Sequence, residues 1–304
     1  MIQQLPLFQR KTFPVVPIQD IPPVTPTDAS SILATLPAYL RYLQSSSTSQ
    51  YTPNDYTKDI QKLGVYLREK QLQEITSVDV RGWLVVLKTQ EHMSEKSISR
   101  KISALSSYFS WLCSEKVLEH NPVADIPNSK VIAPLPSILF ETEIIKLLAT
   151  ASADCRTYLL VLLLLETGLK TEEVMTIRLE HIDTTNKYAP VLWVKHVGKK
   201  MKKDRKLKLP RELVPVLEEY LATYRITDLL FPMTQRWLRY LLTSAGEKAG
   251  ITKRISVQLL RDTCAVRLLQ HGEPMETVLE KLGLSISTWE DAKEKYIKLT
   301  SKAL

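Results

Sequence analysis

The chain has 304 residues, of which 44% are hydrophobic and 24% charged, the composition of a globular protein with room for two domains. Three scattered cysteines argue against a disulfide framework and favour a reducing, cytoplasmic location. The N-terminus lacks a basic-then-apolar signal pattern, and the longest apolar run, at 158–165, is too short to span a bilayer. No metal-ligand spacing or phosphate-binding glycine loop occurs, so we expect neither a metal nor a cofactor.

Residues 1–27 carry six of the 17 prolines and little periodicity, which predicts a flexible or extended arm; whether it docks on a neighbouring subunit stays open. From 28 to 120, apolar residues recur at helical spacing, as in Ile98, Ile102 and Leu105. This pattern predicts a domain of four helices. Their expected ranges are 29–46, 53–70, 77–90 and 95–117, and Ser94 and Ser97 are candidate N-caps for the last.

Three basic residues, Lys96, Arg100 and Lys101, fall in the first turns of that last helix, off its apolar stripe. Cations near a helix N-terminus are well placed to meet phosphates. A solvated helix face explains them equally well, so both interpretations stay open.

A second domain follows a proline-rich linker. Asn121-Pro122 ends the helical block, and four prolines between 122 and 136 predict a linker at 121–138. The domain at 139–304 is expected to be mainly helical with one small antiparallel sheet, a hairpin at 190–209. The helices are predicted at 141–152, 155–167, 171–179, 211–224, 234–249, 256–271, 274–282 and 288–300.

The net charge of +8 is concentrated in that hairpin. Residues 195–211 hold nine Lys or Arg and one acid, which leaves 32 basic and 32 acidic residues elsewhere. A concentrated basic patch favours a polyanion partner, with nucleic acid the first candidate. A solvated loop is the alternative, but the apolar strand residues on both sides of the run favour a hairpin anchored in a core.

The order of these features resembles the tyrosine site-specific recombinases, also called the phage integrase family. The segments that carry the resemblance lie at 51–56, 97–100, 121–122, 166–183, 194–210, 258–272 and 281–299. The resemblance implies a mainly α fold, with a four-helix, SAM-like core-binding domain before an α+β catalytic domain. It also implies that the partner is double-stranded DNA, bound by homodimers or homotetramers, with no membrane involved.

The family cuts DNA by the attack of a tyrosine on a backbone phosphate, which leaves a 3′-phosphotyrosine, and it needs no metal. The resemblance places the nucleophile at Tyr296, although that residue also fits an apolar helical stripe and lies a few residues further from Gly283 than is usual. It places a phosphate-gripping arginine at Arg261. Lys199 falls where a general acid is expected, with Lys200 as its alternate.

Several positions depart from the family pattern. Lys170 stands in place of an arginine, which keeps the charge but loses the planar fork, and Gln258 in place of a histidine. Leu284 replaces a donor, and Asp262 brings a negative charge beside the phosphate site. His196 is one hairpin residue that offers a substitute. The site is therefore interpreted as divergent and partly degraded.

Three functions are consistent with the sequence. The first is an active recombinase, the second a pseudo-recombinase that binds DNA without cutting it, and the third a helical interaction protein. Either DNA-binding interpretation predicts that basic side chains supply the phosphate contacts. Besides the site cations, the expected contacts are Lys96, Arg100, Lys101, Lys200, Lys202, Lys203 and Arg205.

Overall fold

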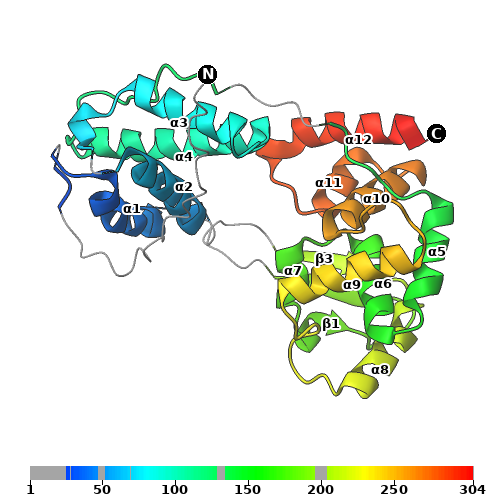
Figure 1. Cartoon of the computed structure of the whole chain (residues 1–304). Helices are drawn as coiled ribbons and strands as arrows, with labels where there is room; N and C mark the ends of the chain where they lie inside the picture. Colours follow the sequence, from blue (N-terminus) through cyan, green and yellow to red (C-terminus); the bar gives the residue numbers. More distant parts are fainter. Residues whose placement is uncertain are drawn as a thin grey trace, which may run out of the picture. The chain divides into compact units, whose positions relative to one another are not determined.

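The computed structural model describes residues 25–27, 29–46, 52–68, 70–128, 134–195 and 204–303. The chain divides into two compact units, Met1–Ala133 and Pro134–Leu304, each with its own apolar core (Figure 1). The described residues are mainly helical, as predicted, and their strands form one small antiparallel sheet. Among the described helices, none is both long and apolar enough to cross a membrane.

Four α-helices build the first unit, as the apolar spacing predicts. They are α1 (Ile32–Ser46), α2 (Thr52–Leu67), α3 (Ser77–Thr89) and α4 (Glu95–Ser114), with the short 3-10 helix η2 (Leu72–Glu74) between α2 and α3. Their apolar faces enclose a core in which Leu36, Tyr39, Tyr108 and Phe109 are fully buried. The Tyr39 and Tyr108 rings meet edge to face, with centroids 5.1 Å apart, and so join α1 to α4.

The helix ends of this unit follow local backbone chemistry. Ser94 caps α4, because its hydroxyl accepts a hydrogen bond from the Ser97 amide (3.3 Å). Helices α2 and α4 each end three residues earlier than the apolar pattern predicts. Arg68 and Lys116, just beyond the two ends, have left-handed φ angles of 59° and 58°, which the helix cannot continue through. Neither residue is glycine, so the sequence gives little warning of the stop.

The second unit packs its other helices and a small sheet around one buried helix, α6 (Cys155–Thr167; Figure 1). Its helices are α5 (Glu141–Ala151), α6 (Cys155–Thr167), α7 (Thr171–Thr176), η3 (Leu179–His181), α8 (Leu213–Tyr224), α9 (Gln235–Lys248), α10 (Val257–Gln270), α11 (Met275–Lys281), η4 (Ile286–Thr288) and α12 (Trp289–Ala303). The apolar run at 158–165 lies within α6, and most of its side chains are buried. Helices α10, α11 and α12 pack around a second apolar cluster of their own.

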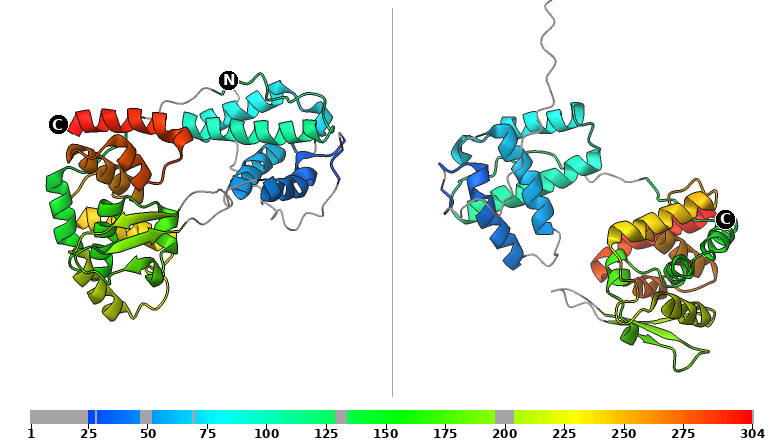
Figure 2. Two further views of the ribbon diagram at one scale, coloured as in Figure 1. Left: turned by 180° about the vertical axis from the view of Figure 1, so that it is seen from behind. Right: turned by 60° about the horizontal axis from the view of Figure 1, so that its bottom comes forward.

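The sheet of this unit has the order β1-β2-β3 and is antiparallel throughout (Figure 2). Strands β2 (Val191–Val194) and β3 (Arg205–Lys208) form the predicted hairpin, with Leu192 opposite Leu207. The third strand, β1 (Ile182–Asp183), was not predicted, because two residues are too few to show alternation. Helix α7 stops at 176, not 179, because the Ile177 carbonyl accepts instead from the Leu230 amide (2.8 Å).

Gly168 ends α6 and fixes the path of the loop that follows. Its φ is 61°, in the left-handed region, and a Cβ there would lie 2.6 Å from Leu282 Cδ2. Only glycine fits both demands. The turn brings 168–170 against the segment 281–284, which follows α11.

Candidate functional site

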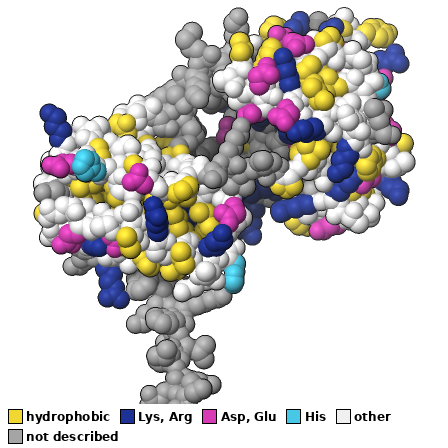
Figure 3. Space-filling model, turned by 90° about the horizontal axis from the view of Figure 1, so that it is seen from above, with side chains coloured by type: hydrophobic (Ala, Val, Ile, Leu, Met, Phe, Trp, Pro, Cys, Tyr) yellow, Lys and Arg dark blue, Asp and Glu magenta, His cyan; other side chains and the backbone are white. Residues whose placement is uncertain are grey.

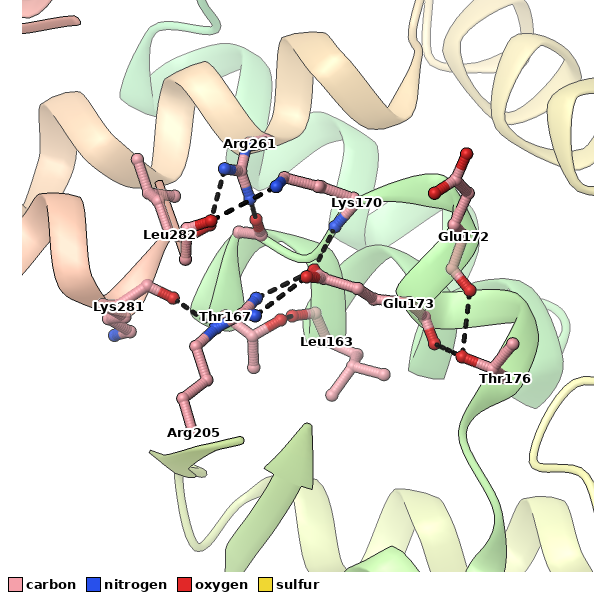
Figure 4. Close-up of polar contacts among 12 residues, drawn as sticks. Leu163, Thr167, Lys170, Glu172, Glu173, Thr176, Arg205, Arg261, Lys281 and Leu282 are labelled. Atoms are coloured by element: carbon pink, nitrogen blue, oxygen red, sulfur yellow. Dashed lines mark hydrogen bonds and ion pairs between the residues drawn. The ribbon is translucent and has the colours of Figure 1, made fainter. Parts of the chain in front are cut away.

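Arg261 is a buried cation of the predicted site. It lies on α10, its side chain is 3% exposed, and one guanidinium nitrogen, Nη1, donates to the Gly168 carbonyl. The other, Nη2, donates to the Leu282 carbonyl (2.6 Å) (Figure 4). Burial lowers the pKa of Arg261 from its ordinary value, with the neighbouring Tyr296 and Glu173 acting against the decrease. The guanidinium is therefore fixed where the two loops meet.

Lys170 reaches the same place from the start of α7. Its ammonium Nζ donates to the Gly283 carbonyl at 3.2 Å, and its backbone amide donates to Glu173 Oε2 at 2.8 Å. Figure 4 shows the Lys170 ammonium and the Arg261 guanidinium directed at the same stretch of backbone. Two cations predicted to serve one site, Lys170 and Arg261, thus lie together.

Arg205 forms a brace beneath these cations. Its Nη1 and Nη2 each donate to one carboxylate oxygen of Glu173, both at 2.8 Å, and its Nε donates to the Lys281 carbonyl (2.9 Å). Both side chains of the pair are 16% exposed. Burial acts to raise the pKa of Glu173, but the hydrogen bonds and charge of Arg205 outweigh it, and the pKa lies below its ordinary value. Arg205 thus donates to two groups within the protein, and its predicted contact with DNA phosphates stays a prediction.

Tyr296 lies on α12, with its ring in the apolar cluster of α10, α11 and α12. The side chain is 3% exposed, as its place in the apolar helical stripe predicts. The hydroxyl nonetheless has a polar partner, since it donates to Asp262 Oδ1 at 3.0 Å. Burial raises the pKa of Tyr296, the Asp262 charge raises it further, and Arg261 opposes both. Tyr296 thus combines a ring in the apolar core with a hydroxyl that is hydrogen-bonded to a carboxylate.

Asp262 also accepts hydrogen bonds from two other polar residues, Gln258 and Lys295. Gln258 Nε2 donates to Oδ1 at 2.9 Å and Lys295 Nζ at 2.6 Å. The side chain of Asp262 is fully buried, so its charge is compensated mainly by Lys295. The negative charge expected beside the phosphate site is thus turned toward α12 and neutralised there.

The basic residues predicted on α4 have different surroundings. Lys96 is exposed. Arg100 is half exposed, and its Nη1 lies 2.6 Å from Asp59 Oδ2. Lys101 is 3% exposed, with its ammonium 2.5 Å from Asp59 Oδ1. The expectation that Lys101 lies off the apolar stripe is wrong, because residue 101 follows Ile98 by three positions and shares its buried face.

The remaining predicted residues divide into two groups. Leu284 packs beside the apolar cluster, and its side chain brings no hydrogen-bond donor to the site. The hairpin tip at 196–203 lies outside the described residues. The roles predicted for residues of that tip therefore stay predictions, and these residues are His196, Lys199, Lys200, Lys202 and Lys203.

Two contributors were missed by the sequence reasoning. Glu173 orients Arg205 and the Lys170 backbone, and Lys295 compensates Asp262. A weak signal existed for Glu173, since a glutamate three positions after a helix start often bonds back to the first amide. Lys295 had none, because an exposed lysine beside a stripe is commonplace on helices.

Figure 3 shows lysines and arginines interspersed with acids on the face that it draws. Among the described residues, no group of three or more His, Cys, Asp or Glu is arranged to hold a metal ion. The three cysteines are free thiols. By sequence, the excess positive charge of this protein falls at 195–211.

Comparison with known proteins identifies both units. Residues 139–289 match the phage integrase family, and 36–116 match the N-terminal SAM-like domain of phage integrases. The first match ends before Tyr296. The tyrosine recombinase XerC of Listeria welshimeri is 31% identical over 268 residues, covering 81% of this chain and 87% of the relative. A tyrosine recombinase of Pseudothermotoga lettingae is 30% identical over 266 residues, covering 84% and 90%.

Solved structures share the fold. The recombinase XerH bound to a palindromic difH substrate has a TM-score of 0.73 at 19% identity, covering 91% of this chain and 95% of that one. A lambda integrase dimer bound to a COC′ core site has a TM-score of 0.69 at 18% identity, covering 86% and 76%. Together with the sequence matches, these likenesses show that the chain belongs to the phage integrase family of tyrosine recombinases.

Proposed function

We propose that this protein binds duplex DNA and acts in site-specific recombination, cutting and rejoining strands through Tyr296 in a divergent active site. The observation that carries the proposal is the gathering of Arg261 and Lys170 at one loop, with Tyr296 electrostatically coupled to Arg261. Two neighbouring cations, one of them electrostatically coupled to a hydroxyl nucleophile, suit attack on a phosphodiester, whose transition state gains negative charge.

The proposed chemistry has three parts. The Tyr296 oxygen attacks a backbone phosphorus, which gives a 3′-phosphotyrosine and releases a 5′-hydroxyl. Arg261 and Lys170 stabilise the charge that develops on the phosphate oxygens. The two terminal nitrogens of Arg261, Nη1 and Nη2, each carry a second N–H beyond the one bonded to a carbonyl. Lys199, or Lys200 beside it, protonates the leaving oxygen. A DNA hydroxyl later reverses the link.

The site is proposed to be weaker than the family pattern implies. Lys170 gives a point contact where an arginine gives a fork, and Leu284 supplies no donor. Gln258 uses one N–H of its amide on Asp262 and cannot shuttle a proton as a histidine does. Each lost donor of this kind costs on the order of 10²–10³ in rate, although losses within one site need not multiply.

A second candidate is a pseudo-recombinase that binds DNA without cutting it. It is favoured by two observations, namely that Tyr296 is 3% exposed and that its hydroxyl is held by Asp262. Both candidates use the same DNA-binding surface. In either case the first unit is the proposed core-binding domain and the second the proposed catalytic domain. The proposed location of the protein is the cytoplasm.

Assembly on DNA is also proposed. The lambda integrase structures comprise a dimer on a core site and a tetramer on a Holliday junction. By analogy, we propose that this chain acts as a dimer or tetramer on paired half-sites.

The test uses the whole chain and duplexes selected by it from a randomised pool. Binding is expected to weaken steeply as salt rises, with a smaller slope when Lys199, Lys200, Lys202 and Lys203 become Ala. A nicked suicide duplex of the selected sequence should then trap a covalent adduct that is absent from Tyr296→Phe. Binding without an adduct would leave the pseudo-recombinase, and absence of salt-sensitive duplex binding would leave only the interaction protein.

A further inference from the structure

Asp262 has a hydrogen-bonding pattern that its structural role does not require. Its Oδ1 receives three donors, the Tyr296 hydroxyl at 3.0 Å, the Lys295 ammonium at 2.6 Å and the Gln258 amide at 2.9 Å. Its Oδ2 is buried and has no hydrogen-bond partner among the described residues. The Tyr296 hydroxyl is directed at Oδ1, so a proton that leaves it would pass to that oxygen.

The hydroxyl of Tyr296 must lose its proton before or during attack on phosphorus. Burial and the Asp262 charge raise the pKa of this phenol, so it is protonated at neutral pH. The groups that act on it electrostatically are Arg261, Asp262 and Cys264 from α10, while Lys295 Nζ, from its own helix, lies 4.9 Å from the ring centroid. Among these, Asp262 alone is an anion within hydrogen-bond distance of the hydroxyl.

We propose that Asp262 is the proton acceptor for Tyr296 in strand cleavage, an inference that rests on the proposed role of Tyr296 as nucleophile. The O–H bond of Tyr296 breaks and its proton passes to the carboxylate, while the phenolic oxygen forms a bond to phosphorus. The bond between phosphorus and the 5′-oxygen breaks, and that oxygen takes a proton from the general acid. Rejoining returns each proton to its source, so no other reactant is consumed.

Two neighbours suit Asp262 to this role. Lys295 is 30% exposed, so its ammonium can compensate the carboxylate before transfer and turn to water afterwards. Gln258 donates to the same oxygen and orients the carboxylate from one helical turn away. The glutamine in place of a histidine thus becomes a positioning residue for Asp262.

The first experiment measures adduct formation on the nicked suicide duplex with Asp262→Asn. The asparagine keeps the shape but not the basicity, and we expect cleavage to slow on the order of 10²–10⁴-fold. Replacing Tyr296 in that variant by 3-fluorotyrosine, a more acidic phenol, is expected to restore part of the rate. A carboxylate that only ties α12 to α10 would show no such rescue.

Asp154 supplies a matched control. It is another carboxylate of the same unit that accepts a tyrosine hydroxyl, from Tyr224 at 2.5 Å, and it caps α6 at the end opposite Gly168. Asp154→Asn should leave the cleavage rate and its pH profile unchanged. If Asp262→Asn folds poorly, Asp262→Glu is the second variant, and it should cleave faster than the asparagine variant because it retains a carboxylate.

A second measurement needs no DNA. The ¹⁹F resonance of 3-fluorotyrosine at 296 should titrate at lower pH in Asp262→Asn than with Asp262 present, because the neighbouring charge is gone. An unchanged titration, or a variant that cleaves like the unmodified protein, overturns the inference and leaves the proposed function intact. Failure of the unmodified protein to form any adduct overturns both.

Discussion

Each unit of this protein buries an aspartate, and the two sites differ in how the charge is neutralised. In the first unit, Asp59 is held by Lys101, which is 3% exposed, and by Arg100. In the second, Asp262 is held by a lysine that is 30% exposed and by two neutral donors. The first arrangement is closed and serves stability. In the second, one donor is the hydroxyl of Tyr296, a candidate nucleophile, so the aspartate is placed to accept its proton.

The largest expected effect is on the first aspartate. Asp59→Ala leaves the Lys101 ammonium buried without its partner, and we expect unfolding free energy to fall by about 3–5 kcal/mol. Calorimetry gives the size of the loss, and hydrogen exchange should locate it in α2 and α4. Lys88→Ala, at an exposed pair with Glu95, should change neither. If Asp59→Ala lost as little stability as Lys88→Ala, the buried pair of Asp59 with Lys101 would not be a main source of stability in this unit.

The same change at the second aspartate should cost less. Asp262→Ala leaves the buried Tyr296 hydroxyl without its acceptor, but Lys295 can turn to water, so we expect a loss of about 1–3 kcal/mol. The comparison is made by calorimetry against Lys298→Ala, at an exposed pair on α12 that should be silent. If Asp262→Ala proves costlier than Asp59→Ala, the contrast between the two sites is wrong.

A pH dependence is expected at the Arg205–Glu173 brace. The pKa of folded Glu173 lies below its ordinary value of 4.5, so its stabilisation is fully present above about pH 4.5 and is lost as pH falls through the folded value. Glu173→Gln keeps one acceptor for Arg205 and should cost about 1 kcal/mol at neutral pH. Thermal unfolding across pH should show the two proteins converging in acid. A constant difference would mean that the carboxylate charge does not matter.

The smallest effect is expected at the surface of α4. Lys96 is exposed, so Lys96→Ala should weaken duplex binding slightly and reduce the salt slope by about 1, with stability unchanged. Lys101, buried on the same helix, should contribute nothing to that slope. Binding titrations at several salt concentrations measure the difference. An unchanged slope in Lys96→Ala would remove α4 from the proposed DNA-binding surface.

The sequence predicted the helices more accurately than the contacts of the site residues. Apolar periodicity located the four helices of the first unit and the basic hairpin, because burial imposes a repeat that is visible residue by residue. It placed Lys101 on the wrong face of its helix and did not foresee the pair of Arg205 with Glu173, since a cation looks the same in sequence whether it faces water or a buried acid. It located Arg261, Lys170 and Tyr296 only through the family resemblance, since their separation along the chain carries no distance information.

By itself, the sequence determined the mainly helical fold, the concentration of charge in one hairpin and the membership of a DNA recombinase family. Those properties follow from composition, local spacing and motif order. Only the tertiary structure decided that Arg205 pairs with Glu173, that Lys101 pairs with Asp59, and that Asp262 accepts a hydrogen bond from the Tyr296 hydroxyl. These pairings join residues far apart along the chain, and only the packing of helices and loops determines which charge lies beside which.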